Sequence, residues 1–190
     1  GNMNRFEFIM VLVSILIGLG VAELLQSVAT IIRVACRGRT LSLLWLINML
    51  NMLIQYFWAS WVQADKLEWS YFELLMLLMG PIIMYIICSL LRVLEQHSEE
   101  LDGQFINQRR PFFILFISLM VTFSLSDFLF GGSVMEEGEY GLGQHLVRVV
   151  ATGLFIFLMV TKRRSLHITG SLVFLMIQAF FIINWTWLLS

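Results

Sequence analysis

Two acidic residues lie within apolar segments, where a charge is costly, and they are the residues best suited to chemistry. Glu23 lies in SILIGLGVAELL, residues 14–25, and Asp127 lies in SLMVTFSLSDFL, residues 118–129. An isolated carboxylate in hydrocarbon costs ~3 kcal/mol on insertion scales, so each acid is expected to be protonated, paired or facing water. A protonatable group of this kind can carry a proton or a cation. The alternative is a hydrogen bond or an ion pair that joins two helices.

Asp127 has an obvious partner in the sequence. Arg148 enters the next apolar segment at a similar depth, so an ion pair between Asp127 and Arg148 is a sufficient structural explanation for this acid. The position equivalent to Arg148 in the first half of the chain is Leu44, which leaves Glu23 without such a partner. We therefore rank Glu23 first among the candidate ion-binding residues and Asp127 second.

Three amide side chains share one face of a predicted helix, at i, i+3 and i+7: Asn48, Asn51 and Gln55. Their depths bracket that of Glu23, so they could line an aqueous path with it. They could equally form interhelical hydrogen bonds worth ~0.6 kcal/mol each. Two further amides, Gln178 and Asn184, do not share a face with each other, and we expect no role for them beyond lining a pore.

Gly80 and Pro81 interrupt an apolar segment near its middle. Proline cannot donate an intrahelical hydrogen bond, so it frees a carbonyl and kinks the helix. The freed backbone could meet a substrate or act as the hinge of a gate. A structural kink is the preferred interpretation, because proline is well tolerated in membrane-spanning helices.

These residues must be positioned by membrane-spanning helices. The chain has 190 residues, of which 59% are hydrophobic and 13% charged, with a mean hydropathy of +0.85, which is far from the composition of a soluble domain. Six segments reach or approach the roughly 20 apolar residues needed to cross a bilayer. They are residues 6–32, 41–61, 73–94, 112–130, 146–161 and 167–189. The predicted fold is an all-α integral membrane protein with six transmembrane helices.

Basic residues gather in three of the connections between these helices, and all three connections fall on one side of the membrane. They are Arg33, Arg37 and Arg39, then Arg92, Arg109 and Arg110, then Lys162, Arg163 and Arg164. The positive-inside rule assigns these connections to the cytoplasm and both termini to the outside. We expect the inner, cytoplasmic membrane of a bacterium.

The two acidic segments also suggest an internal repeat. In register and without gaps, Glu23 pairs with Asp127, and small or polar residues pair at Ser14, Gly18, Gly20 and Ala22. The halves, residues 1–102 and 103–190, would each contain three helices, so the second would be inverted, as in many secondary transporters. Small residues at every fourth position allow close helix packing, within the bundle or between copies of the chain, and indicate that the first helix lies inside the bundle.

Several chemistries lack the residues they need. The HExxH motif of metalloproteases is absent, and no Gly-x-Ser motif, phosphate-binding loop or nucleic-acid module occurs. The connection at residues 95–110, EQHSEELDGQFINQRR, carries acidic residues and a histidine at no metal-ligand spacing, and we expect a solvated helical extension that ends near Gly103 before Pro111 opens the fourth helix. We expect no metal, no cofactor and no nucleic-acid partner.

The favoured interpretation is a small transporter or channel for protons, cations or a small polar solute, embedded in the lipid bilayer as a monomer or a homo-oligomer. Glu23 would bind the ion, Asn48, Asn51 and Gln55 would line the route, and Asp127 would be the related outer site. The alternative is a structural or regulatory membrane subunit whose basic cytoplasmic loops contact a partner protein or anionic lipid. An intramembrane enzyme acting on lipid ranks third, because no catalytic constellation supports it.

Overall fold

The computed structural model describes residues 5–33, 38–61, 68–95, 101–130 and 138–186, and every element in this part of the chain is an α-helix. Six of the helices are long and apolar enough to cross a membrane, which confirms the predicted all-α fold with six candidate spans. The helices are α1 (Arg5–Arg33), α2 (Thr40–Ser60), α3 (Tyr71–Glu95), α4 (Leu101–Asn107), α5 (Arg109–Phe130), α6 (Gly138–Val160) and α7 (Arg164–Thr186).

The short helix α4 differs from the predicted solvated extension. It continues through Gly103 to Asn107, and it buries Leu101, Asp102 and Phe105 instead of exposing one face to water. Leu101 and Phe105 are four residues apart and therefore share a helix face, which explains the burial. Helix α5 begins at Arg109, so Pro111 lies in its first turn, where the missing N–H is not needed.

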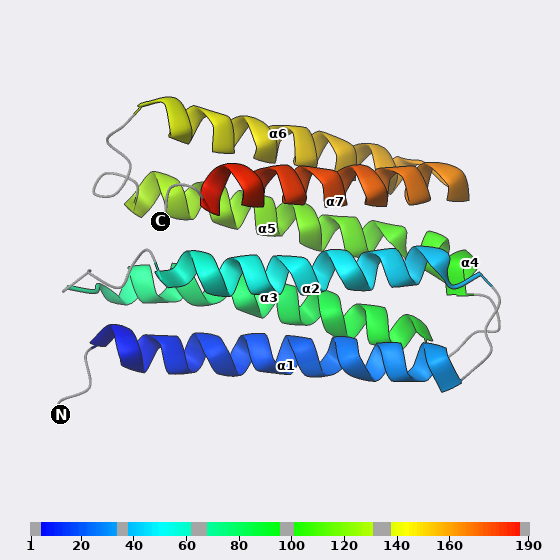
Figure 1. The fold of residues 1–190 in the computed structure, drawn as a ribbon, viewed down its shortest axis with the longest axis horizontal. Coiled ribbons are helices and arrows are strands. Elements are labelled where there is room, and N and C mark those ends of the chain that lie inside the picture. The colour runs from blue at the N-terminus through cyan, green and yellow to red at the C-terminus, as the bar shows by residue number, and fades with distance from the viewer. Residues whose placement is uncertain (1–4, 34–37, 62–67, 96–100, 131–137, 187–190) are drawn as a thin grey trace.

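The six long helices lie side by side, with α1 at one edge of the bundle and α6 at the other (Figure 1). Helix α1 packs on α3 and α2, which pack in turn on α5 and α7, and these two helices pack on α6. Helix α4 lies at one end of the bundle, against the starts of α2, α5 and α7.

The prediction that the first helix lies inside the bundle is therefore wrong. Ser14, Gly18 and Ala22 are exposed, and a Cβ atom at Gly18 would meet nothing within 4 Å. The close approach of α1 occurs instead at Gly20, where a Cβ atom would lie 3.3 Å from the side chain of Leu53. The larger apolar residues of α1 bury the opposite face, so the small residues are left on the outer surface.

The two halves of the chain pack differently. Helices α1 and α3 have the most extensive contact in the described part of the chain. A two-fold axis relating residues 1–102 to 103–190 would pair this contact with one between α5 and α7, but α5 packs instead along α6 and α3. The contacts between helices therefore do not follow the symmetry that the sequence alignment suggests.

An aromatic cluster forms the core on the side of α2 that faces the second half. Trp45 is fully buried, and six phenylalanine rings from α4, α5, α6 and α7 lie within 6.4 Å of its ring centre. Aromatic pairs at such distances contribute about 0.5–1.5 kcal/mol beyond their buried area. The rings around Trp45 are Phe105, Phe112, Phe113, Phe116, Phe155 and Phe174.

Candidate functional site

Glu23, the leading candidate, has a partner. Nη1 of Arg92 lies 2.8 Å from Oε2 of Glu23, and the Glu23 side chain is 15% exposed while that of Arg92 is 37% exposed. The expectation that Glu23 lacks a basic partner is therefore wrong. Arg92 lies in the last turn of α3, and α3 packs along α1, so its side chain can reach back to the acid.

The residues one turn before this ion pair show how tightly α1, α2 and α3 meet. Gly20 precedes Glu23 on α1, and buried Cys88 precedes Arg92 on α3. A Cβ atom at Gly20 would lie 3.3 Å from Leu53 of α2 and 3.8 Å from Sγ of Cys88. The pair thus joins α1 to α3 directly beside a closely packed, apolar contact.

Asp127 and Arg148 also form an ion pair, the one that the sequence suggested. Nη1 of Arg148 lies 2.6 Å from Oδ2 of Asp127, with the side chains 16% and 30% exposed respectively. This pair joins α5 to α6, whereas Glu23 joins α1 to α3. Since α1 and α6 lie at opposite edges of the bundle, the two acids belong to separate interfaces (Figure 1).

The amide stripe of α2 bonds to α7. Gln178 donates from Nε2 to Oδ1 of Asn48 at 3.0 Å, and its Oε1 accepts from Nδ2 of Asn51 at 2.6 Å and from Nε2 of Gln55 at 3.4 Å. Asn48 also donates to the carbonyl of Ser171 at 3.2 Å. The three amides of α2 therefore form hydrogen bonds with Gln178 and not with Glu23.

Gln178 is the residue whose role the sequence interpretation missed. It is buried, and it holds all three amides of α2, so pore lining is wrong for it. Its depth offered a signal: counted from the shared end of the bundle where α2 and α7 begin, Gln178 lies at nearly the level of Gln55. The side chain of Asn184, the other amide of this helix, lies outside the described residues.

The Gly80-Pro81 site is packed rather than open. Helix α3 continues through it, and the hydroxyl of Tyr56 donates to the carbonyl of Leu77, the carbonyl that Pro81 leaves without its intrahelical donor. A Cβ atom at Gly80 would lie 2.9 Å from Cε2 of Tyr56 and 3.0 Å from Cε1 of Phe123. The geometry favours the structural interpretation, because the carbonyl that Pro81 frees has a hydrogen-bond donor and the site is closely packed.

Asp102 is a second residue that the sequence interpretation missed, because it was assigned to a solvated extension. Its carboxylate is fully buried, accepts from Nε of Arg164 at 2.7 Å and from the backbone N–H of Leu41 at 3.0 Å, and lies 2.6 Å from Nη2 of Arg164. Its own N–H donates to the carbonyl of Gly38 at 2.8 Å. A carboxylate near a helix N-terminus is favoured by the helix dipole. Asp102 thus ties the starts of α2 and α7 to α4.

The same end of the bundle carries exposed cations. The end of α1, the start of α2, the start of α5 and the connection from α6 to α7 meet there (Figure 1). Five basic residues at this end are exposed, and no ion pair joins them to another residue that the structure describes. We call this surface the basic end, and it consists of Arg33, Arg39, Arg110, Lys162 and Arg163.

Comparison with known proteins adds no relative. No family model matches the chain, and no curated protein or solved structure matches it significantly. In the described ranges, no group of three or more His, Cys, Asp or Glu side chains is placed to hold a metal ion. Fold and site together define a helical membrane protein with six candidate spans, in which polar side chains within the spans join neighbouring helices.

Proposed function

We propose that the protein is a non-transporting structural or regulatory membrane subunit, which holds an anionic partner at its basic end. One observation carries this proposal: the polar residues that could have formed an ion pathway are bonded across helix interfaces. Glu23 pairs with Arg92, Asp127 pairs with Arg148, and the amides of α2 bond to Gln178. This is the chemistry of helix association in a bilayer.

An ion pathway would require these bonds to be broken and remade. Breaking either ion pair costs about 1 kcal/mol, since its side chains are partly exposed, and each interhelical bond of the amides adds ~0.6 kcal/mol. Glu23 and Asp127 also lie in different interfaces, α1 with α3 and α5 with α6, and the packed contact of α3 with α5 lies between them. An ion passing from one acid to the other would have to cross the closely packed centre of the bundle.

The basic end supplies the binding surface of the proposed subunit. Each Lys or Arg beside an anionic membrane surface contributes about 1 kcal/mol, an attraction that fades over a Debye length of about 8 Å at physiological salt. By the positive-inside rule we assign this end to the cytoplasm of a bacterial cell and both termini to the outside of its inner membrane. An acidic protein surface or an anionic headgroup fits its charge.

A polyanion probe tests the basic end. The protein is reconstituted in phosphatidylcholine nanodiscs, and the binding of a fluorescent polyglutamate peptide is measured by anisotropy at low and at physiological salt. The triple variant Arg33→Gln, Arg39→Gln and Arg110→Gln should weaken binding by at least about tenfold at low salt, where each charge counts most. Equal binding by the variant and the wild type would contradict the proposal.

Transport is the second candidate function, and one observation favours it. The two acid–arginine pairs lie toward opposite ends of the long helices, as would gates that open alternately. The 3+3 inverted repeat and a homo-oligomer of transporting subunits belong to this candidate. The flux of protons and monovalent cations into proteoliposomes distinguishes transport from the subunit function. A flux that is lost in a correctly folded Glu23→Gln variant would support transport. A wild-type flux no greater than that of empty vesicles would support the subunit function.

A further inference from the structure

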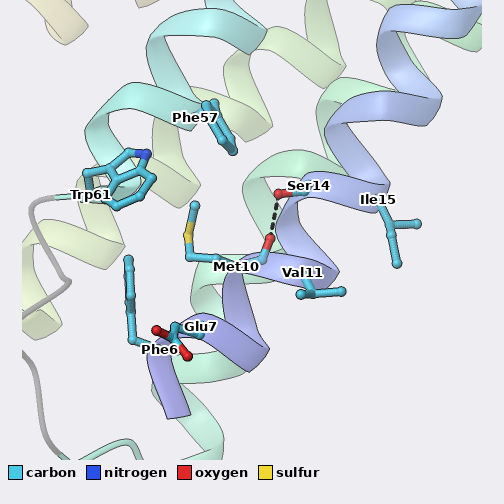
Figure 2. Close-up of a pocket in the computed structure, with 8 residues that line it drawn as sticks. All are labelled: Phe6, Glu7, Met10, Val11, Ser14, Ile15, Phe57 and Trp61. Carbon is cyan, nitrogen blue, oxygen red and sulfur yellow. Dashed lines mark hydrogen bonds between the residues drawn. The ribbon is translucent and has the colours of Figure 1, made fainter. Parts of the chain in front are cut away.

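The open depression between the start of α1 and the end of α2 has mainly apolar walls (Figure 2). Its carboxylate, Glu7, already has an interaction in the structure, and the hydroxyl of Ser14 donates to the carbonyl of Met10 at 2.6 Å. A cation without a counter-charge among the described residues lies instead at the opposite end of the bundle. It is Arg109, in the first turn of α5.

Arg109 is buried, and its charge is not compensated by any residue that the structure describes. The residue is 6% exposed, and no ion pair joins it to another described residue. Its Nη1 donates to the carbonyl of Ile106 at 2.8 Å, while its Nε is enclosed without a partner. A buried charge is costly unless it is paired and hydrogen-bonded, so one neutral carbonyl leaves this guanidinium in need of an anion.

A neighbouring arginine shows which edge of the guanidinium would bind that anion. Arg164 contacts Oδ2 of Asp102 through Nε at 2.7 Å and through Nη2 at 2.6 Å. These two nitrogens form a planar fork that matches the oxygens of a carboxylate or a phosphate. On Arg109 the same fork has no bond to a described residue, and Nη2, which is not enclosed, opens it to the surface. Asp102 cannot serve both arginines, because its other oxygen accepts from the N–H of Leu41.

Arg109 lies beside the start of α7. The rings of Phe105, one turn before Arg109, and of Phe113, one turn after it, both contact His167 of α7, at 6.2 and 5.8 Å between ring centres. The guanidinium of Arg109 is also close enough to interact electrostatically with His167. Arg163 lies one turn before His167, whose N–H donates to the Arg163 carbonyl at 3.3 Å. The buried Arg109 and the exposed Arg163 are therefore at the same level, at the starts of two helices.

Both helix starts carry cations where an anion is favoured. The N-terminus of a helix bears a partial positive charge and binds phosphate groups readily. Neither α5 nor α7 has an acidic residue in its first turn, and α5 begins with Arg109 and Arg110. Two candidate spans begin here, at Arg109 and Arg164, so the site would lie at the level of the lipid headgroups. Basic pockets between spanning helices bind phospholipid headgroups at this level.

We propose that the fork of Arg109 binds the phosphate group of an anionic phospholipid, while Arg110 and Arg163 attract its charge. The lipid belongs to the leaflet that meets the basic end. This inference rests on the proposed subunit function and deepens it, because it names the partner that the basic end holds.

Native mass spectrometry of the full chain tests the site. The protein is equilibrated in mild detergent with equal amounts of dioleoyl phosphatidylglycerol and dioleoyl phosphatidylcholine, which share their acyl chains, and the bound lipids are counted. The wild type should retain the glycerol lipid in excess. Arg109→Gln should lower that preference by at least about tenfold, because charge-assisted hydrogen bonds are lost. Arg109→Lys, which keeps the charge without the planar fork, should lower it by less.

Arg33→Gln is the matched comparison, since it removes an exposed charge of the basic end on α1, away from α5 and α7. It should lower the preference by less than about fivefold. Equal losses from Arg33→Gln and Arg109→Gln would show a diffuse attraction to the whole basic end. That result would overturn the site and leave the proposed subunit function intact, whereas the polyglutamate probe shows whether the subunit function itself fails.

Thermal unfolding in bicelles shows whether the variant is folded and where the phosphate comes from. In phosphatidylcholine alone, Arg109→Gln should be at least as stable as the wild type, because an uncompensated buried charge is removed. Adding phosphatidylglycerol should raise the midpoint of the wild type by about 2–4 °C and leave that of Arg109→Gln unchanged. A variant less stable than the wild type in phosphatidylcholine would show that the charge is already compensated and would overturn the proposal. An equal rise of the wild-type midpoint with inorganic phosphate, at the same ionic strength, would assign the site to free phosphate and overturn the lipid partner.

Discussion

Replacing Tyr56 by Phe removes a single oxygen atom, and it tests whether the Tyr56 hydroxyl satisfies the carbonyl that Pro81 frees. The Tyr56 hydroxyl donates to the carbonyl of Leu77, which has no intrahelical donor because Pro81 lacks an N–H. Without that donor the carbonyl is left unsatisfied in an apolar, packed site. We expect Tyr56→Phe to lower the free energy of unfolding by about 1–2 kcal/mol, between the average intramembrane hydrogen bond and the cost of an unsatisfied buried acceptor.

The structure predicts that this loss depends on the proline. In Pro81→Ala, a backbone N–H at position 81 can donate to the carbonyl of Leu77, so the Tyr56 hydroxyl is no longer its required donor. Adding Tyr56→Phe to Pro81→Ala should then cost less than about 0.5 kcal/mol, which gives a coupling energy near 1 kcal/mol. Unfolding in bicelles, followed by helical circular dichroism, measures all four proteins.

Tyr85→Phe is the matched control, since Tyr85 is half-buried on the same helix and its hydroxyl has no hydrogen-bond partner in the described residues. It should change the stability by less than about 0.5 kcal/mol. Equal losses from Tyr56→Phe with and without Pro81 would refute the assignment of the hydroxyl to the freed carbonyl. If Gly80 and Pro81 formed a gate instead, Tyr56→Phe should leave the stability unchanged.

Three further variants follow from the contacts described above, each measured as the free energy of unfolding in bicelles. Gln178→Leu should cost about 2 kcal/mol, because three interhelical bonds at ~0.6 kcal/mol each are lost. Met176→Leu is the control on the same helix, and it should be nearly neutral because the Met176 side chain is 70% exposed. Asp102→Asn should cost about 2–3 kcal/mol, since it leaves a guanidinium without its buried carboxylate, and an unchanged stability would contradict the burial of this charge. Gly80→Ala should cost about 1–3 kcal/mol, because the added Cβ atom would lie 2.9 Å from the Tyr56 ring and 3.0 Å from the Phe123 ring. In Gly18→Ala the added Cβ atom meets nothing within 4 Å, so this variant should be neutral or stabilising by up to about 1 kcal/mol. Equal effects of the two variants would contradict the packing at Gly80.

Hydropathy and charge predicted the six long helices, because both depend on the local composition of the chain. Helix α4, which the sequence predicts only as part of a solvated helical extension, is seven residues long, and its burial depends on the tertiary contact of Phe105 with the cluster around Trp45. The burial of the Asp102 carboxylate escapes prediction for the same reason. Its partners at positions 41 and 164 are distant in the chain, so no local pattern could reveal them.

The pairing of polar residues required the relative rotation and shift of the helices, which apolar periodicity does not determine. Asp127 and Arg148 could be paired from the sequence because adjacent helices place them at similar depths. Glu23 bonds instead to α3, a helix that is not its neighbour in the chain. The small residues of α1 mislead for a related reason. Small residues at every fourth position permit close helix packing but do not require it, and in this structure that face of α1 is exposed.

The coupling between Glu23 and Arg92 tests the central claim most directly, namely that charges within the spans join helices. The measurement is the free energy of unfolding in bicelles of the wild type, Glu23→Gln, Arg92→Gln and the double variant. If the pair joins α1 to α3, each single variant should lose about 1 kcal/mol and the double variant no more than the larger single loss, a coupling near 1 kcal/mol. Strictly additive losses, or full stability in both single variants, would show that the two side chains do not hold the helices together and would contradict the account.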